Sequence, residues 1–309
     1  MDAPTIQKIK NKNFTWIDVS QCNYEEMHHL KQNFDLRSAH INDCLSKIQR
    51  PKLDLEKNYI FMVLLFPVYN RKTRKIKPSE VDFFIGPDYL ITIHRSELNP
   101  LMNFFNSCKI NSVEREKYLT GKSSVLLYEI LRNLFDYCVP ILDALNSNIN
   151  SIEENIFKGY EKKMVREILI AKTNIVNFRK IMQAHSSVIL KLTNKGELFF
   201  PSLKYKEYLK EILESTEDIW SNVENLKQSI EAIENTNNSL ISFQLNDVIK
   251  ILTTISAIIL PITLIASIFS MNLQFMPLSN NPFAFWFITG LMILVLAFLF
   301  HVFKNKKWL

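Results

Sequence analysis

Long apolar stretches dominate the C-terminal part of the chain. Residues 251–271 and 283–303 each form a run of 21 residues without Asp, Glu, Lys or Arg, and residues 272–282 between them are also uncharged. About 20 apolar residues are enough to cross a bilayer as a helix. Buried helices of globular domains rarely run this long without a charge. The pattern therefore predicts a transmembrane helical hairpin over residues 246–309, rather than two core helices of a soluble protein.

Basic residues flank this hairpin on one side only. Lys250 precedes the first run, and Lys304, Lys306 and Lys307 follow the second, whereas the connection has neither Lys nor Arg. Positive residues tend to stay on the cytoplasmic side of a membrane. We therefore expect a multi-pass protein of the cell (inner) membrane with both termini in the cytoplasm and the three C-terminal lysines at the membrane interface.

The first 120 residues mix strand and helix signals. Strands are predicted where β-branched and aromatic residues gather, at residues 16–19, 59–68, 80–85 and 89–94. One helix is predicted between residues 24 and 48, and the basic segment 70–78 is predicted to be a loop. His28, His29 and His40 follow no metal-ligand spacing and are interpreted as solvated helix residues. Residues 1–120 are thus predicted to form a cytosolic α/β domain.

Helical periodicity takes over after residue 120. Residues 123–192 predict two long antiparallel helices with a turn near Gly159. From Ser202, apolar residues recur at alternating steps of three and four as far as Val248, which predicts a third helix that continues into the first apolar run. Some 70 helical residues would extend about 100 Å, so this helix needs partners. We assign residues 121–245 to a coiled-coil-like helical stalk.

The remaining chemistry of the sequence excludes several functions. The chain has no Gly-rich phosphate loop, nucleophile motif or metal-ligand cluster, so we expect neither an enzyme nor an organic cofactor. The net charge is +6 with a pI near 9.0, but basic residues do not interleave with aromatic ones on any element. We therefore expect no binding of nucleic acid.

The last quarter of the chain carries several short motifs. The first run ends in Ser270-Met271-Asn272, Met276-Pro277 follows in the connection, and residues 306–309 read Lys-Lys-Trp-Leu. These motifs resemble the CorA family of divalent-cation channels, which has Gly-Met-Asn and Met-Pro-Glu at the first two places and the same last four residues. Residues 246–253, 261–263 and 49–59 are also similar to the family. The resemblance implies a homopentameric magnesium channel. Ser270 and the acid-free loop are departures that bear on pore-mouth geometry and on the choice of cation.

Polar and apolar residues alternate along the helix that would line such a pore. Because two spans cannot enclose a pore, a pore requires a symmetric ring of copies. With the resemblance, Asn272 would offer side-chain oxygens to a hydrated Mg²⁺, which releases its water reluctantly. The rest of the expected path is Met271, Ser270, Thr263, apolar collars at Leu260, Leu252 and Ile249, and Asn246 at the cytosolic end. The alternative for the polar residues is helix–helix packing within the membrane.

The resemblance also implies a regulatory metal site. In the family, acidic residues between the stalk helix and a neighbour's N-terminal domain bind magnesium and hold the pore closed. The corresponding positions here are Glu211 and Asn70, of which Asn70 is not an acid, and Glu214 and Asp218 lie close along the same helix.

Two other functions fit the pattern. The first is transport of another divalent ion such as cobalt, nickel or zinc. The second is a two-span anchor for a coiled-coil scaffold, for which Asn272 at the outer end of a span would serve no purpose.

Overall fold

The computed structural model describes residues 6–21, 23–46, 48–119, 122–196, 199, 203–271 and 283–306. The chain divides into two compact units, Met1–Glu234 and Asn235–Leu309, and each is described by itself below. The sequence analysis placed boundaries at residues 120 and 245, where the predicted kind of secondary structure changes. These boundaries stay a prediction, because the two compact units are defined differently.

A mixed sheet forms the centre of the first unit. Its strands are β1 (Ile6–Asn11), β2 (Phe14–Ser20), β3 (Lys52–Leu55), β4 (Ile60–Asn70), β5 (Lys75–Ile85) and β6 (Tyr89–His94). Within the described residues they follow the order β1-β2-β6-β5-β4-β3, with β2 and β6 parallel and the other neighbours antiparallel. The four predicted strands are confirmed, whereas the edge strands β1 and β3 were missed.

The predicted loop over residues 70–78 is wrong. Strand β4 continues to Asn70 and β5 begins at Lys75, so residues 71–74 alone connect them. The reason is that the two-residue alternation of a strand continues through this segment, although its many basic residues obscure it. Ile76 is 1 % exposed, while Lys75 and Lys77 on either side of it point to solvent. Arg74 closes the turn in the left-handed region, with φ of 56°.

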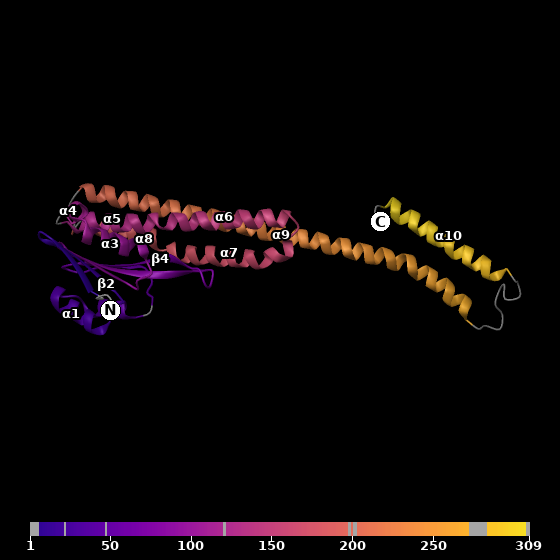
Figure 1. Ribbon diagram of the computed structural model, residues 1–309, viewed down its shortest axis with the longest axis horizontal. Helices are drawn as coiled ribbons and strands as arrows, with labels where there is room; N and C mark the ends of the chain where they lie inside the picture. The colour runs from indigo at the N-terminus through magenta and orange to yellow at the C-terminus, as the bar shows by residue number, and fades with distance from the viewer. Residues whose placement is uncertain are drawn as a thin grey trace. The chain divides into compact units, whose positions relative to one another are not determined.

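Two short helices cover one face of the sheet (Figure 1). The single helix predicted between residues 24 and 48 is in fact α1 (Tyr24–Phe34) and α2 (Ser38–Leu45), because Asp35 adopts left-handed angles and ends α1. A capping box of Asn23 and Glu26 begins α1. Both helices pack on apolar residues of β2, β4, β5 and β6, which form the core on this side.

The prediction that His40 is a solvated helix residue is wrong. His28 and His29 are exposed on α1, as expected, but His40 on α2 is only 3 % exposed. Its Nδ1 lies 2.9 Å from the Tyr59 hydroxyl, and its ring stacks on Phe61. Burial lowers the pKa of His40, so the ring is a neutral part of the core.

The other face of the sheet carries a helical layer. Its helices are α3 (Asn99–Ile110), α4 (Ser112–Tyr118), α5 (Ser123–Asp136), α6 (Cys138–Phe157), α7 (Glu161–Met182) and α8 (His185–Lys195). Aromatic contacts join the layers, with Trp16 against Phe105 and Phe66 against Phe135. The turn near Gly159, which has φ of 87°, is confirmed. The two predicted helices are however four, with breaks at Tyr137 and after Met182.

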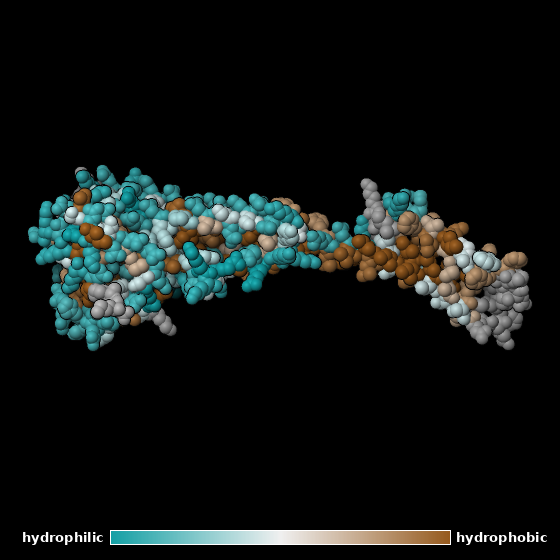
Figure 2. Space-filling model, viewed as in Figure 1, coloured by the Kyte–Doolittle hydropathy of each residue, from teal (hydrophilic) through white to brown (hydrophobic). Residues whose placement is uncertain are grey.

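The long third helix is confirmed as α9 (Leu203–Ser270). In the first unit its buried residues follow alternating steps of three and four, a period near 3.5. They are Tyr205, Leu209, Ile212, Thr216, Ile219, Val223, Leu226, Ile230 and Ile233. In the second unit α9 continues and α10 (Ala284–Asn305) follows. Apolar side chains cover the surface of this second unit, whereas the surface of the first is mainly hydrophilic (Figure 2).

Candidate ion pathway and charge cluster

The predicted pathway residues in the described part of the chain share one face of α9. Each residue turns an α-helix by about 100°, so residues 246, 249, 252, 260, 263 and 270 fall within an arc of about 120°. All of them are exposed in a single chain, and Leu252 and Leu260 are 64 % and 66 % exposed. The face therefore begins with Asn246, continues with the apolar side chains of Ile249, Leu252 and Leu260, and ends with the hydroxyls of Thr263 and Ser270. Met271, just after the helix, is 54 % exposed.

The hydroxyl groups on this face donate to their own helix. Thr263 Oγ1 lies 3.1 Å from the Ile259 carbonyl and 2.9 Å from that of Leu260, and Ser270 Oγ lies 3.0 Å from the Ser267 carbonyl. With its hydrogen used in this way, each hydroxyl oxygen presents lone pairs outward. Such an oxygen can accept a hydrogen bond from the water shell of a cation. Pro261, two residues before Thr263, lacks an N–H and so cannot donate to the carbonyl of Ala257 four residues back.

The ends of the hairpin are described in part. Asn272, the connection as far as residue 282, and Lys307 lie outside the described residues. Lys304 and Lys306 are exposed at the C-terminal end of α10, where the helix dipole favours cations. Both α9 and α10 contain a stretch that is long and apolar enough to cross a membrane.

The predicted regulatory acids lie on the first unit. Glu211, Glu214 and Asp218 are exposed and recur at steps of three and four along α9, so they share one face. Tyr128 of α5 donates a hydrogen bond of 2.7 Å to Glu211 and stacks on Tyr208. Burial, helped by the Glu211 carboxylate, raises the pKa of Tyr128 to about 12. The phenol therefore stays a donor that fixes the orientation of Glu211.

Asn70 lies at the end of β4, and its side chain is already engaged. Its Oδ1 accepts a hydrogen bond of 3.0 Å from the Thr73 N–H and so closes the turn of the β4–β5 hairpin. No hydrogen bond joins Asn70 to the three acids in the part of the chain that the structure describes. Among those residues, likewise, no three His, Cys, Asp or Glu side chains gather as a metal site.

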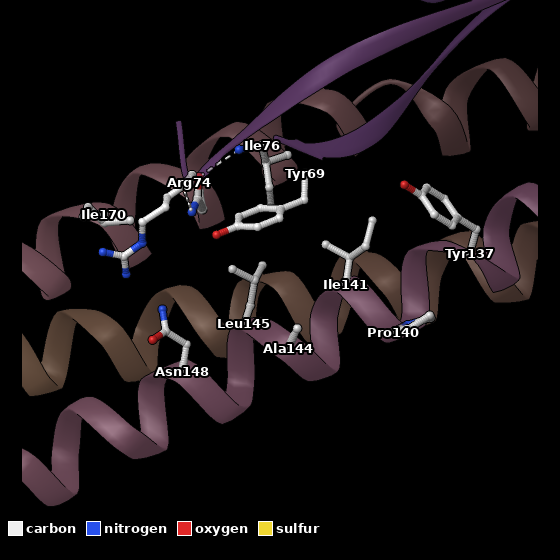
Figure 3. Close-up of a pocket in the computed structure, with 11 residues that line it drawn as sticks. Tyr69, Arg74, Ile76, Tyr137, Pro140, Ile141, Ala144, Leu145, Asn148 and Ile170 are labelled. Atoms are coloured by element: carbon white, nitrogen blue, oxygen red, sulfur yellow. Dashed lines mark hydrogen bonds between the residues drawn. The ribbon is translucent and has the colours of Figure 1, made fainter. Parts of the chain in front are cut away.

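An open groove of about 400 Å³ lies between the hairpin, α6 and α7 (Figure 3). Tyr69 and Arg74 of the hairpin lie over Ile141 and Leu145 of α6, and Asn148 lies at one end. Its lining is mainly apolar. Sequence reasoning missed this groove, and it missed Tyr128 as the partner of Glu211. No local pattern signals either feature, because each joins residues far apart in the chain.

Comparisons with known proteins agree with this architecture. The cobalt/magnesium transport protein CorA of Thermotoga maritima is 25 % identical over 304 residues, which cover 96 % of this chain and 83 % of that protein. The protein of the same name from Methanocaldococcus jannaschii is 22 % identical over 311 residues, covering 95 % and 91 %.

The fold as a whole has a solved counterpart. The complete structure of the CorA magnesium transporter from Methanocaldococcus jannaschii matches with a TM-score of 0.83 at 20 % identity, covering 97 % of this chain and 93 % of that one. This confirms the predicted α/β domain, long helix and C-terminal apolar helix. The family model described as CorA-like Mg²⁺ transporter protein matches residues 11–306. The chain therefore belongs to this family of divalent-cation transporters, which are not enzymes.

Proposed function

We propose that this chain forms a homopentameric channel for magnesium in the cell (inner) membrane, with both termini in the cytoplasm. The observation that carries the proposal is the face of α9 in the second unit. It carries an amide at one end and hydroxyl groups at the other, with apolar residues between them, and it is exposed in a single chain. A ring of such faces would enclose a polar path interrupted by apolar constrictions, which can close by dewetting.

Asn272 is proposed to select the hydrated ion at the outer end of this path. A ring of amide oxygens accepts hydrogen bonds from the water shell of Mg²⁺ without stripping it. Ser270, Met271 and Thr263 would continue the path inward. The membrane potential would drive entry, contributing about 2.3 kcal/mol per charge per 100 mV, and twice that for a divalent ion.

The test is uptake of magnesium into liposomes that hold the purified full-length protein. Asn272→Ala should abolish uptake and leave oligomer size unchanged, while Asn222→Ala, at an exposed α9 position of the first unit, serves as the matched control. Normal uptake by the Asn272 variant would overturn the selectivity ring. Absence of uptake by the wild type, with every divalent ion supplied, would favour the scaffold anchor.

Cobalt is the second candidate cargo. Two relatives are named cobalt/magnesium transport proteins, and Ser270 and Leu278 depart from the family motif at the pore mouth. Titrating magnesium, cobalt, nickel and zinc in the same liposomes would rank them. Introducing Leu278→Glu should lower the half-saturating concentration, because a loop carboxylate concentrates cations.

Cytosolic magnesium is proposed to close the channel through Glu211, assisted by Glu214 and Asp218, and Asn70 of a neighbouring copy. One carboxylate and one amide should hold a hydrated ion less tightly than two carboxylates. Asn70→Asp should therefore lower the internal magnesium concentration that halves the flux, while Glu211→Lys should make the flux insensitive to it. Superimposed inhibition curves for the wild type and both variants would remove these residues from the sensor.

A further inference from the structure

The turn between α6 and α7 lies at one end of the first unit. Helix α7 runs antiparallel to α9 there: Arg179 pairs with Glu224, and Lys172 pairs with Glu234 at 2.5 Å. Glu234 is the last residue of the unit, and α7 begins at Glu161. From Lys172 back to Glu161, α7 therefore extends about 16 Å past the level of Glu234, in the direction in which α9 runs.

The β4–β5 hairpin does not reach this turn. It packs on α7 between Glu167 and Asn177: Arg74 Nη1 donates to Glu167 Oε1 at 3.0 Å, and Asn177 Nδ2 donates to the Ile76 carbonyl at 3.1 Å. Residues 161–166 of α7 precede these contacts, and the paired ends of α6 and α7 extend past the hairpin (Figure 1). The sheet therefore leaves the turn uncovered.

Exposed cations and aromatic rings gather at this turn. They are Phe157, Lys158, Tyr160, Lys162, Lys163 and Arg166, here called the basic turn. Phe157 and Tyr160 are 69 % and 46 % exposed, and Lys163 Nζ lies 5.0 Å from the centroid of the Tyr160 ring. The Cα–Cβ bonds of a helix tilt toward its N-terminus, so the three cations that belong to α7 lean toward the turn.

Few acids oppose these cations. Residues 157–166 contain four basic residues and one acid, Glu161, which is buried. Lys158 pairs with Glu154 at 3.4 Å, but both side chains are exposed, and such a pair contributes little. Glu153 is a further exposed acid near the end of α6. The other three cations of the basic turn make no ion pair in the part of the chain that the structure describes, so the turn offers a net positive charge to a partner.

We propose that the basic turn rests on the anionic headgroups of the membrane into which the second unit inserts. Cations beside amphipathic rings are typical of segments that lie at a lipid interface. The seventeen residues from 235 to 251 link the first unit to the first apolar run and extend about 25 Å as a helix. A surface tethered this closely to a bilayer meets it at a high effective concentration. A few cations are therefore enough for binding.

Charge complementarity favours lipid as the partner. The cytoplasmic leaflet, toward which the proposed orientation places the first unit, carries anionic lipid. The exposed Lys304 and Lys306 of the second unit have the same sign as the basic turn and cannot neutralise it. An acidic protein surface would also match the cations, and it is the alternative that the experiment separates. The inference rests on the proposed membrane orientation but does not require that the chain conducts magnesium.

The test follows the approach of the basic turn to the headgroups in full-length protein held in lipid nanodiscs. Val165→Cys, at an exposed position of α7, carries a fluorescent probe. Cys22→Ser removes a thiol that lies outside the described residues, and the described cysteines are buried. A nitroxide on the lipid headgroup quenches the probe at close range. Discs of phosphatidylcholine are compared with discs that contain phosphatidylcholine and phosphatidylserine in equal parts.

Each basic residue near an anionic surface favours binding about fivefold. Wild-type quenching should therefore be about twofold stronger with phosphatidylserine, and high salt should remove the difference. Lys162→Glu with Lys163→Glu should lower the docking constant by about thirtyfold and so abolish the difference. The matched control, Lys191→Glu with Lys195→Glu, reverses two exposed lysines of α8, which follows the other end of α7, and should quench like the wild type.

Equal quenching of the wild type in both lipids would overturn the proposal, and so would a charge-reversed variant that quenches like the wild type. A charge-reversed variant that lowers the oligomer fraction in detergent, with no lipid-dependent quenching, would assign the basic turn to a contact between copies instead. Phe157→Ser should weaken quenching in both lipids, because the ring enters the interface independently of charge. Unchanged quenching in that variant would remove the ring from the contact.

Magnesium uptake by the wild type in liposomes is measured on the same preparation. Uptake without lipid-dependent quenching rejects this inference alone. Lipid-dependent quenching without uptake rejects the proposed channel and leaves the docking of the basic turn standing.

Discussion

The two units of this chain differ in the exposure of their apolar side chains and in the hydrogen-bond partners of their polar side chains. In the first unit, Phe61 and Phe84 are fully buried on the sheet, and Asn174 bridges elements far apart in the sequence. In the second unit, large apolar residues such as Leu294 and Phe298 are more than 60 % exposed. The hydroxyls of α9 there donate to their own helix four residues back, as Thr253 and Ser256 do.

This difference shows how the apolar side chains of each unit are kept from water. The first unit carries its own core, so its apolar residues leave water by folding. The second unit leaves its apolar faces exposed in a single chain, as expected of helices that lie in lipid, where a helix satisfies its own backbone hydrogen bonds. Substitutions that are matched in chemistry should therefore have unequal effects in the two units.

The largest expected effect comes from removing a core ring. Phe84→Ala should lower the free energy of unfolding by about 3–5 kcal/mol, because it leaves a cavity among packed rings. Phe298→Ala, the same change at a residue 63 % exposed on α10, should cost less than about 1 kcal/mol, since lipid or detergent fills the space. Urea titration of the full chain in detergent measures both. Equal losses would show that α10 has a core of its own.

A charge placed on two equally exposed leucines should sharpen the contrast. Leu294 on α10 and Leu169 on α7 are 66 % and 64 % exposed. Leu294→Lys should disfavour membrane insertion by about 2.5–3.5 kcal/mol, the cost of a cation near the centre of a span. Leu169→Lys should change stability by less than about 0.5 kcal/mol. A glycosylation-mapping assay reads insertion, and normal insertion of the Leu294 variant would show that this position does not face the apolar interior of a bilayer.

The sequence predicted those parts of the fold that depend on period and length. Helix α9 was predicted to within a residue at its start, because its apolar steps persist over many turns. The break at Tyr137 was missed although Pro140 signals it: proline at this position cannot donate to the carbonyl four residues back. Strands β1 and β3 are short edge strands of mixed polarity, for which alternation gives little signal.

The candidate sites likewise depend partly on helical spacing and partly on tertiary packing. The resemblance to the family selected the predicted pathway residues and the three acids, and helical spacing placed them on faces of α9. Tertiary packing decided the rest: Tyr128 reaches Glu211 across 83 positions, and Asn70 is taken up by its own turn. The pore mouth at Asn272 lies outside the described residues and stays a prediction.

The buried acid Asp82 gives the first unit a pH dependence of its own. It is 2 % exposed on β5, its Oδ1 has no hydrogen-bond partner among the described residues, and burial raises its pKa to about 8, helped by the nearby Glu80 carboxylate. Unfolded aspartate has a pKa near 3.9. Between these values the folded state binds the extra proton, so stability falls as pH rises and levels off above about 8.

The measurement belongs above pH 6.5. Burial lowers the pKa of His185 to about 4, so in this range His185 is neutral in the folded state and at least half deprotonated in the unfolded state. From pH 6.5 to 8 the wild type should lose about 1.5 kcal/mol of unfolding free energy through Asp82, and Asp82→Asn should flatten the curve. Asp247→Asn, at an exposed position of the second unit, is the control and should keep the wild-type slope. A slope that survives in the Asp82 variant would assign the titration to another group.

The smallest expected loss of stability comes from comparing a side chain that hydrogen-bonds to another element with one that hydrogen-bonds within its own helix. Asn174→Ala leaves the buried Ile76 N–H without its acceptor and the Arg74 carbonyl without its donor, so it should cost about 1–2 kcal/mol. Ser242→Ala removes a hydroxyl that donates to the Asn238 carbonyl of its own helix at 2.8 Å. That carbonyl keeps its helical partner, and alanine favours helix more than serine does, so stability should stay within about 0.5 kcal/mol of the wild type.

Urea titration compares the two variants, and hydrogen exchange at Ile76 reports the hairpin directly. Faster exchange at Ile76 in the Asn174 variant alone is expected, because only that variant releases the hairpin from α7. Unchanged exchange would mean that the Arg74–Glu167 pair and Asn177 hold the hairpin by themselves.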